Sequence, residues 1–203
     1  MNLDSENKWV VGVDEAGRGP LAGPVSVGIV RAPEGYDLLA VFPGLNDSKQ
    51  LTEKKREILF NLLEERVAAG ELSYSVQLKS AQLIDRQGIA VVIRDAIEEG
   101  LAELLEDAAM GKVWLDGALR APSQYEQETV IGGDGLIPAI MLASVAAKVT
   151  RDRLMVQLAN KHPQYGFEKH KGYGTRAHLD AIRAHGQCEL HRSSFIHLDR
   201  VAA

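Results

Sequence analysis

Four acidic residues stand where predicted strands end, and their type and placement could support chemistry on a phosphodiester. They are Asp14, Glu15, Asp116 and Asp134. In α/β sheets, ligand sites are commonly built beyond the strand ends. Carboxylates gathered there repel one another unless cations lie between them, and hard oxygen ligands select Mg²⁺ or Mn²⁺ over zinc. The pattern indicates metal-assisted phosphoryl transfer, in which two ions about 3.5–4 Å apart clamp the attacking water and the leaving oxygen.

Each of these acids also has an ordinary structural explanation, because Asp at the end of a strand is often a turn former or a helix cap. Asp14 and Glu15 raise a further difficulty, since consecutive strand residues point to opposite faces of a sheet. Gly17 and Gly19 follow directly. We therefore expect a sharp turn that begins at Glu15 and brings its side chain round to the side of Asp14.

Alternating strands and helices must position these acids. Strands are expected at 9–13, 25–30, 72–78, 112–116 and, from a weaker pattern, 128–131, and the first two form a hairpin. Helices are expected from Thr52 as N-cap to Gly70, after Ser80 as cap, and over 89–106, 136–161 and 175–184, with Pro138 in a first turn and Gly186 closing the last. The hairpin and the later strand–helix steps predict an α/β fold, a mixed sheet flanked by helices.

Length and composition fit an ordinary globular protein. The 203 residues suit a single domain. Hydrophobic residues make up 45% and charged residues 25%, which argues against disorder and fibrous repeats. No uncharged run approaches the roughly 20 apolar residues that cross a bilayer, and no apolar signal segment precedes Trp9. The single cysteine, Cys188, cannot form an internal disulfide, so we expect a cytoplasmic location.

The charge distribution leaves room for a nucleic-acid partner. The net charge of −5 argues mildly against one, because phosphate binders are usually basic. Residues 148–192, however, hold nine Lys and Arg against four Asp and Glu, together with five of the six histidines. A basic C-terminal quarter on an acidic body is compatible with a phosphate backbone, and equally with a solvated helical surface.

Seven short sequence motifs occur along the chain, and their order is more specific than any one of them alone. They are DEAGRGPLAGPV (14–25), GLNDSK (44–49), VWLDG (113–117), GGD (132–134), AKVTRDR (147–153), HKGYGT (170–175) and HRSSF (191–195). This ordered set spans nearly the whole chain and resembles ribonuclease HII, the type 2 ribonuclease H. The resemblance implies one domain over 1–203, with a ribonuclease H-like core over about 1–160 and a C-terminal helical extension over about 161–203.

The resemblance also implies a function and a metal site. Such enzymes hydrolyse the RNA strand of RNA–DNA hybrids and incise 5′ to ribonucleotides embedded in duplex DNA, leaving 3′-hydroxyl and 5′-phosphate ends. Mn²⁺ or Mg²⁺, with two ions at turnover, would bind the four acids that carry the family's motif, Asp14, Glu15, Asp116 and Asp134. Asp14 would contact both ions. The implied roles are excision of misincorporated ribonucleotides and help in primer removal during DNA replication, by a monomer with no membrane partner.

The resemblance assigns substrate recognition to a glycine turn and a tyrosine. Gly17-Arg18-Gly19 lets the backbone approach a sugar closely, since glycine carries no Cβ, and polar backbone groups there can sense a 2′-hydroxyl. Tyr173 would pack on the next sugar and favour a deoxyribose there. A plain tight turn and an ordinary core or surface tyrosine are the alternatives. Lys49 lies inside a matched motif and is expected to contact phosphate.

Other residues of the motifs have less specific roles. Lys148, Arg151, Lys169 and Lys171 are further possible phosphate contacts, although surface lysines are usually only solvated. His170 is expected to be structural or phosphate-facing rather than a general base. Asp152 is expected to be a helix salt-bridge partner, with a metal ligand as the weaker alternative.

The chain departs from the family pattern at two places, and other functions stay open. Gly132 stands where the family commonly has Lys, which removes a possible phosphate contact, and Met141 and Leu142 stand in an often alanine-rich stretch. Another ribonuclease H-fold nuclease, such as a junction resolvase or a transposase-like enzyme, would share strand-end acids. A catalytically silent nucleic-acid-binding module is a second alternative. A nucleotide cradle is disfavoured because the glycine-rich stretch lacks a GK[ST] ending.

Overall fold

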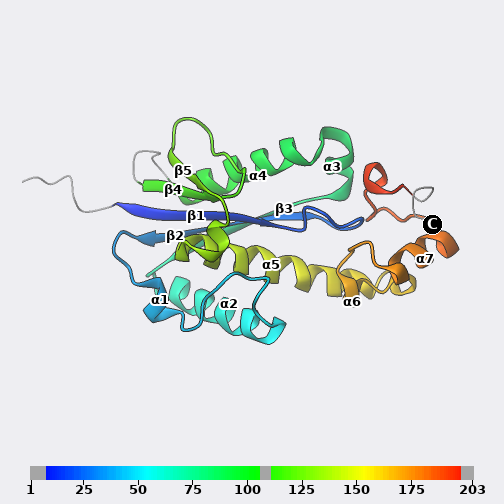
Figure 1. Cartoon of the computed structure of the whole chain (residues 1–203), viewed down its shortest axis with the longest axis horizontal. Helices are drawn as coiled ribbons and strands as arrows, with labels where there is room; N and C mark the ends of the chain where they lie inside the picture. Colours follow the sequence, from blue (N-terminus) through cyan, green and yellow to red (C-terminus); the bar gives the residue numbers. More distant parts are fainter. Residues whose placement is uncertain (1–7, 106–110, 198–203) are drawn as a thin grey trace, which may run out of the picture.

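Residues 8–105 and 111–197, described by a computed structural model, form a five-stranded mixed sheet with helices on both faces (Figure 1). The strands are β1 (Trp9–Ala16), β2 (Val25–Pro33), β3 (Ser73–Lys79), β4 (Gly111–Asp116) and β5 (Glu126–Val130), in the order β3-β2-β1-β4-β5. β2 pairs antiparallel with β1 and β3, and β4 pairs parallel with β1 and β5. The predicted hairpin and mixed sheet are confirmed.

The helices form two layers and a C-terminal group. They are α1 (Leu38–Val41), α2 (Glu53–Ala68), α3 (Ala81–Gln87), α4 (Ile89–Leu104), α5 (Pro138–Ala159), α6 (Phe167–His170) and α7 (Arg176–His185), with single 3-10 turns η3 (Gly133–Gly135), η4 (Pro163–Tyr165) and η5 (Ser193–Phe195). Figure 1 shows α3 and α4 on one face of the sheet, α1, α2 and α5 on the other, and α6 and α7 near the C-terminal end of α5. None of the described helices, the 22-residue α5 included, has the length and apolar character that a membrane span requires.

Local signals place the main helices as predicted. The hydroxyl of Thr52 accepts a hydrogen bond from the Lys55 N–H at 3.2 Å, and the hydroxyl of Ser80 accepts one from the Leu83 N–H at 3.3 Å. Each cap satisfies a backbone donor that the first helical turn leaves free. Pro138 begins α5, where its missing N–H costs no helical hydrogen bond.

The structure corrects several expected boundaries. β1 continues to Ala16 rather than ending at Val13. β5 ends at Val130, and Ile131 is 88% exposed rather than part of the strand. The helix predicted over 89–106 was expected to end at Glu106, which lies outside the described residues, and α4 ends at Leu104. The single turns α1 and α6 were not predicted, because four-residue helices carry too little hydrophobic periodicity to stand out.

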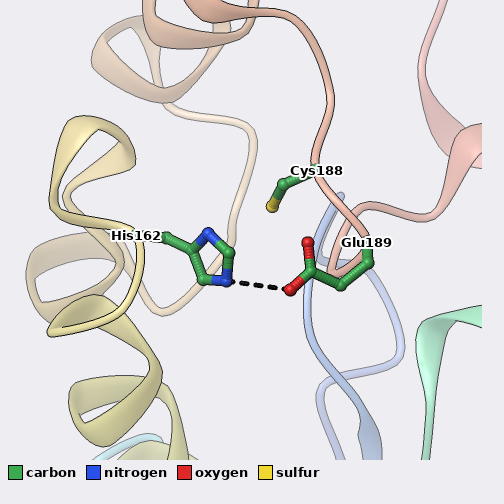
Figure 2. A group of neighbouring side chains, drawn as sticks. All are labelled: His162, Cys188 and Glu189. Carbon is green, nitrogen blue, oxygen red and sulfur yellow. Dashed lines mark ion pairs between the residues drawn. The ribbon is translucent and has the colours of Figure 1, made fainter.

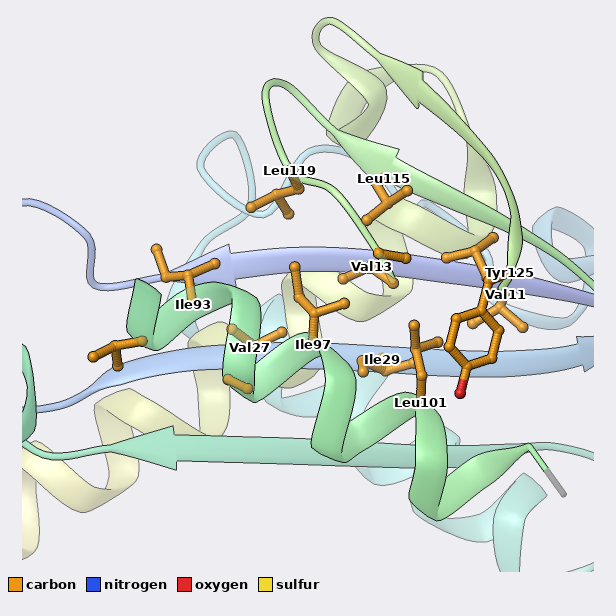
Figure 3. Packing of buried hydrophobic residues seen from close by; sticks show 14 of the residues in the cluster. Val11, Val13, Val27, Ile29, Ile93, Ile97, Leu101, Leu115, Leu119 and Tyr125 are labelled. Carbon is orange, nitrogen blue, oxygen red and sulfur yellow. The ribbon is translucent and has the colours of Figure 1, made fainter. Parts of the chain in front are cut away.

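One core lies between α4 and the sheet (Figure 3). Val11 and Val13 of β1 point toward α4, as do residues of β2 and β4, and Ile97 and Leu101 of α4 meet them without exposure to solvent. Alternation along β1 therefore places Val11, Val13 and the later Glu15 on this face of the sheet, and Gly12 and Asp14 on the opposite face.

α5 packs against the opposite face unusually closely. A Cβ at Gly12 would lie 2.1 Å from the backbone carbon of Ala139, and a Cβ at Gly28 would lie 2.2 Å from the carbonyl oxygen of Ala143. These glycines let the backbones of β1, β2 and α5 touch, because no side chain stands between them. The contact fixes the start of α5, and the loop just before it, relative to β1.

This close approach predicts a large effect of one methyl group. Gly12→Ala should lower the free energy of unfolding by about 3 kcal/mol, since the added carbon meets rigid backbone. The melting temperature should fall by about 6–12 °C in a thermal scan. Gly135→Ala is the matched control, because a Cβ there has no neighbour within 4 Å. Equal melting temperatures for the two variants would contradict this packing.

Candidate active site

Asp14 and Asp116 lie side by side because β1 and β4 run parallel. Val13 is paired with Leu115 in the register of the two strands, so the next residues of both are neighbours. Asp14 is 3% exposed and lies on the face covered by α5, whereas Asp116 ends β4 and is half-buried. The register therefore places these two acids at the ends of neighbouring strands.

The buried position of Asp14 makes its negative charge costly. The pKa of the Asp14 carboxyl is raised to about 8, mainly by burial and to a smaller extent by the nearby carboxylates of Glu15 and Asp116. Ser144 of α5 opposes this rise as a hydrogen-bonding neighbour of the carboxylate. A carboxyl held neutral by its surroundings becomes an anion more easily when a cation lies beside it. The site is therefore electrostatically prepared for positive charge.

Asp134 joins this pair through η3. Its backbone N–H donates a hydrogen bond to Oδ1 of Asp116 at 3.3 Å. Asp134 is 7% exposed, and its carboxylate accepts a hydrogen bond from Nζ of Lys49 at 2.6 Å. This contact raises the pKa of Lys49, with Asp134 as the main cause and Asp14 among the smaller ones. The Lys49 ammonium thus neutralises the acidic group, rather than standing free for a phosphate.

The position of Glu15 corrects the expected turn. Glu15 is paired with Val27 inside regular β1, and the chain turns only at Gly17, where φ is +82°. Its side chain therefore leaves the sheet on the face opposite to Asp14. Its Oε1 lies 3.1 Å from Nη1 of Arg18, close enough to Asp14 to raise the pKa of that carboxyl. No turn at Glu15 brings the two carboxylates onto one face.

The four acids are neighbours, but no three of their carboxylates lie within 4.8 Å of one another. In the described ranges 8–105 and 111–197, the one group of three His, Cys, Asp or Glu ligand atoms within 4.8 Å of one another is His162, Cys188 and Glu189, at another place. The side chains that shift the pKa of Asp14 are nonetheless the hydroxyl of Ser144 and the carboxylates of Glu15 and Asp116, with no imidazole or thiol among them. Such a set fits Mg²⁺ or Mn²⁺, and ions would offset the repulsion that keeps the carboxylates apart.

Two buried arginines hold the glycine turn in place through hydrogen bonds to backbone carbonyl groups. Arg192 donates hydrogen bonds to the carbonyl oxygens of Gly17 at 2.7 Å, Arg18 at 3.0 Å and Gly23 at 2.9 Å. Arg151 donates to the carbonyl of Pro24 at 2.8 Å, and a Cβ at Gly17 would lie 2.0 Å from its Nε. The turn therefore has one fixed conformation that requires glycine.

These arginines change two expectations. Arg151 was expected among possible phosphate contacts, but it is 0% exposed and serves the turn instead, so that expectation is wrong. The role of Arg192 was not predicted, although it lies in a matched motif, because its partners are carbonyl groups about 170 residues away in sequence. Gly19 differs from Gly17, since a Cβ there would have no neighbour within 4 Å. That side of the turn is open.

The loop with Tyr173 is fastened to the same turn. The N–H groups of Leu21 and Ala22 donate to the carbonyl oxygen of Gly172 at 2.9 and 3.3 Å. Tyr173 is 44% exposed, and its ring centre lies 6.0 Å from Nζ of Lys148 and 5.9 Å from the guanidinium carbon of Arg151. The structure thus brings the tyrosine and the glycine turn to one region of the surface.

A chain of hydrogen bonds through two buried histidines supports Tyr173. The Cys188 N–H donates to Nδ1 of His191 at 2.9 Å, so the proton of the neutral His191 ring is on Nε2. That nitrogen lies 3.1 Å from Nε2 of His178, whose Nδ1 lies 2.9 Å from the carbonyl oxygen of Tyr173. Burial lowers the pKa of His178 to about 4 and also lowers the pKa of His191. Both rings are therefore neutral near pH 7.

Two further expectations can be compared with the structure. Nζ of Lys148 lies 2.8 Å from Oδ1 of Asp152, four residues along α5, so Asp152 is a helix salt-bridge partner as expected. His170 is structural, because its Nε2 lies 2.8 Å from the carbonyl oxygen of Tyr165 and its Nδ1 accepts from the Gly172 N–H at 3.3 Å.

An arginine-lined hollow of about 260 Å³ lies on the α4 side of the turn. Arg18 of the turn, Arg94 of α4 and Arg120 after β4 line it, together with apolar residues of α4. Three guanidinium groups around one hollow favour an anionic partner. Arg18 belongs both to this hollow and to the glycine turn.

The sequence is similar to known proteins along most of its length. The sequence profile of the family described as Ribonuclease HII matches residues 11–198. A relative named Ribonuclease HII from Endomicrobium trichonymphae is 42% identical over 187 residues, which cover 92% of this chain and 84% of the relative. One from Bacillus cereus (strain AH820) is also 42% identical, with 92% of this chain and 68% of the relative covered.

The fold is similar to solved structures with related names. The crystal structure of ribonuclease H2 from Pyrococcus horikoshii OT3 matches with a TM-score of 0.74 and 25% identity, covering 95% of this chain and 96% of that one. Bst-RNase HIII in complex with Mn²⁺ matches with a TM-score of 0.67 and 16% identity, covering 97% and 70%. The second similarity concerns the fold alone.

The raised pKa of Asp14 predicts an unusual pH dependence in EDTA. A carboxyl whose pKa is about 8 when folded and near 4 when unfolded binds its proton more tightly in the folded state. Wild-type stability should therefore fall as pH rises from about 4 to about 8. Asp14→Asn should lack this fall and be more stable at pH 8, on the order of 2 kcal/mol, as measured by denaturant unfolding. Glu168→Gln, at an exposed acid of α6, is the control, and identical profiles for wild type and Asp14→Asn would contradict the burial argument.

The lowered pKa of His178 predicts a loss of stability in acid. The folded-state pKa of about 4 lies below the ordinary 6.5, so the unfolded chain takes up the proton first. Stability should fall as pH drops from about 6.5 to about 4, by roughly 2 kcal/mol from this residue. His178→Gln should show a smaller fall over that window, whereas the exposed His185→Gln should follow the wild type. Superimposable profiles for all three would rule out the neutral buried ring.

Proposed function

The chain belongs to the ribonuclease HII family, and from this premise we propose that it incises duplex DNA on the 5′ side of embedded ribonucleotides. As a member of that family it is a metal-dependent endoribonuclease that acts on the RNA strand of RNA–DNA hybrids. The proposed products carry 3′-hydroxyl and 5′-phosphate ends. The observation that carries the proposal is the buried carboxylate of Asp14 beside Asp116 and Asp134, within reach of a glycine turn.

We assign the metal site to Asp14, Asp116 and Asp134, with Glu15 as a fourth ligand. Two divalent ions, Mn²⁺ or Mg²⁺, would when bound supply an activated water and stabilise the departing 3′-oxygen. Support comes from the all-oxygen donors and from the positive charge that Asp14 needs to ionise. The Mn²⁺ complex of Bst-RNase HIII is in keeping with this choice of ion.

The chain's own residues have distinct tasks in this proposal. Asp14 lies deepest and fixes the site against α5, while Asp134 is aligned by its N–H contact with Asp116. Lys49 holds Asp134 in the absence of other cations, and is free to contact a phosphate once that acid binds an ion. Glu15 must rotate from its contact with Arg18 to join the others, because it leaves the opposite face of β1.

Recognition of the ribose is assigned to the glycine turn and Tyr173. Gly17, Arg18 and Gly19 present backbone polar groups in one conformation, since Arg192 holds their carbonyl side. A sugar can approach the open side at Gly19, and a 2′-hydroxyl can hydrogen-bond there. The exposed ring of Tyr173 would pack on the following sugar and favour a deoxyribose. Gly132, in place of a Lys common in the family, removes one possible phosphate contact.

The remaining assignments complete the proposal. Residues 1–203 would act as one domain and one monomer, with a core over about 1–160 and an extension over about 161–203 that supplies Tyr173 and Arg192. We place the enzyme in the cytoplasm, where a single cysteine is kept reduced. Excision of misincorporated ribonucleotides and help in primer removal during replication are the proposed roles.

The central experiment uses a DNA duplex with one ribonucleotide. Wild-type protein with Mn²⁺ or Mg²⁺ should cut on its 5′ side, and excess EDTA should abolish the cut. Asp116→Asn should reduce cleavage by at least about a hundredfold while it retains binding to the duplex, because it removes a charge from the ion site and leaves the turn intact. Asp180→Asn, at an exposed acid of α7, is the matched control and should cut at the wild-type rate.

The same assay separates this proposal from the alternatives. Cleavage of an all-DNA duplex at a comparable rate would indicate a resolvase-like or transposase-like nuclease instead. Binding without cleavage under every metal condition would indicate a silent binding module. Cleavage that persists undiminished in EDTA would overturn the metal mechanism.

A further inference from the structure

A second group of metal-ligating atoms lies in the C-terminal part of the chain and includes none of the carboxylates around Asp14 (Figure 2). It consists of one imidazole nitrogen of His162, the Sγ of Cys188 and one carboxylate oxygen of Glu189, all within 4.8 Å of one another. Nε2 of His162 lies 3.1 Å from Oε1 of Glu189. Figure 2 shows the three side chains pointing toward a common space between two segments.

The spacing of these atoms is near that of a tetrahedral metal site. Ligands of a bound Zn²⁺ are about 3.3–3.8 Å apart, given metal–sulfur and metal–nitrogen bonds of about 2.3 and 2.0 Å. The three side chains need only small rotations from their present separations to reach this geometry. A thiolate and an imidazole are poor ligands for Mg²⁺ and good ligands for Zn²⁺ or Co²⁺.

The ligands come from segments that the fold already holds in place. His162 follows α5, and its N–H donates to the carbonyl oxygens of Leu158 and Ala159 at 3.1 and 3.2 Å. The segment with Cys188 and Glu189 is fixed by a hydrogen bond from the Gly23 N–H to the carbonyl of Leu190 at 2.8 Å. A site built on fixed segments binds an ion with little ordering cost.

Among the residues that the structure describes, three protein ligands belong to this group and no fourth one does. His191 lies close, with Nδ1 3.3 Å from Sγ of Cys188, but that nitrogen accepts the Cys188 N–H at 2.9 Å and is not free. The Glu189 side chain is 65% exposed, whereas that of His162 is 15% exposed, so the site opens to solvent on the glutamate side. Water can therefore complete the coordination.

We propose that His162, Cys188 and Glu189 bind one thiophilic divalent ion of the Zn²⁺ class, with water as the fourth ligand. On binding, the thiol of Cys188 releases its proton and the carboxylate of Glu189 exchanges its contact with His162 for the ion. The ion joins the end of α5 to the segment just before Arg192, which supports the glycine turn.

Cobalt titration tests this site directly, because Cys188 is the only cysteine in the chain. The protein is stripped with EDTA, desalted, kept in a thiol-free reductant and titrated with Co²⁺ without oxygen. A near-ultraviolet thiolate-to-cobalt charge-transfer band should appear and saturate at one equivalent. Zn²⁺ should remove the band, and a large excess of Mg²⁺ should leave it.

Variants decide whether the band comes from this group. Cys188→Ser should lose the band, and Glu189→Gln, which alters an exposed carboxylate and does not threaten folding, should weaken Co²⁺ binding at least about tenfold. His185→Gln, at an exposed imidazole of α7, is the control and should titrate like the wild type. No band in the wild type, or unchanged Co²⁺ affinity in Glu189→Gln, overturns the proposal.

The test is independent of the proposed nuclease function. Asp116→Asn should keep the cobalt band while it loses cleavage, since Asp116 belongs to the carboxylate group and not to this one. A band lost in Asp116→Asn would mean that the thiolate signal depends on the other group, and would also overturn the separate site.

Discussion

The burial of one carboxylate beside others is the constraint on which the site depends. Parallel pairing of β1 with β4 brings Asp14 next to Asp116, and the close contact of α5 with Gly12 covers Asp14 from the other side. A fold that only needed stability would avoid such an arrangement, since an isolated buried charge is costly. The acids make physical sense when positive charge is brought to them, and Lys49 on Asp134 shows that the site already attracts it.

The C-terminal segments hold the glycine turn and Tyr173 in place. Arg192 crosses back to the turn after β1, and Gly172 receives hydrogen bonds from that same loop, so the turn and Tyr173 share one support. The neutral ring of His178 contacts the carbonyl oxygen of Tyr173 and so supports the backbone of the tyrosine. Under the proposed recognition of a ribose, residues nearly the whole chain length apart would determine where the sugar lies relative to the acids. The proposed extension would then be part of the site.

Periodicity, caps and motif order were sufficient to predict the sheet, the long helices and the placement of Asp116 and Asp134 near one another. The turn at Glu15 was predicted wrongly, because the sequence places glycines after it but does not say that pairing with β2 continues through it. Arg192 and His178 were missed as structural residues. Their partners are backbone carbonyls and a ring that become neighbours only after folding, and a single sequence carries no signal of such contacts.

The most direct test of the account is anomalous diffraction from crystals soaked in Mn²⁺. The account predicts an anomalous peak within about 2.5 Å of carboxylate oxygens from both Asp14 and Asp116, with Lys49 displaced from Asp134. Peaks only at other places, with the Lys49–Asp134 contact intact at saturating Mn²⁺, would contradict the claim that these buried carboxylates exist to hold divalent ions.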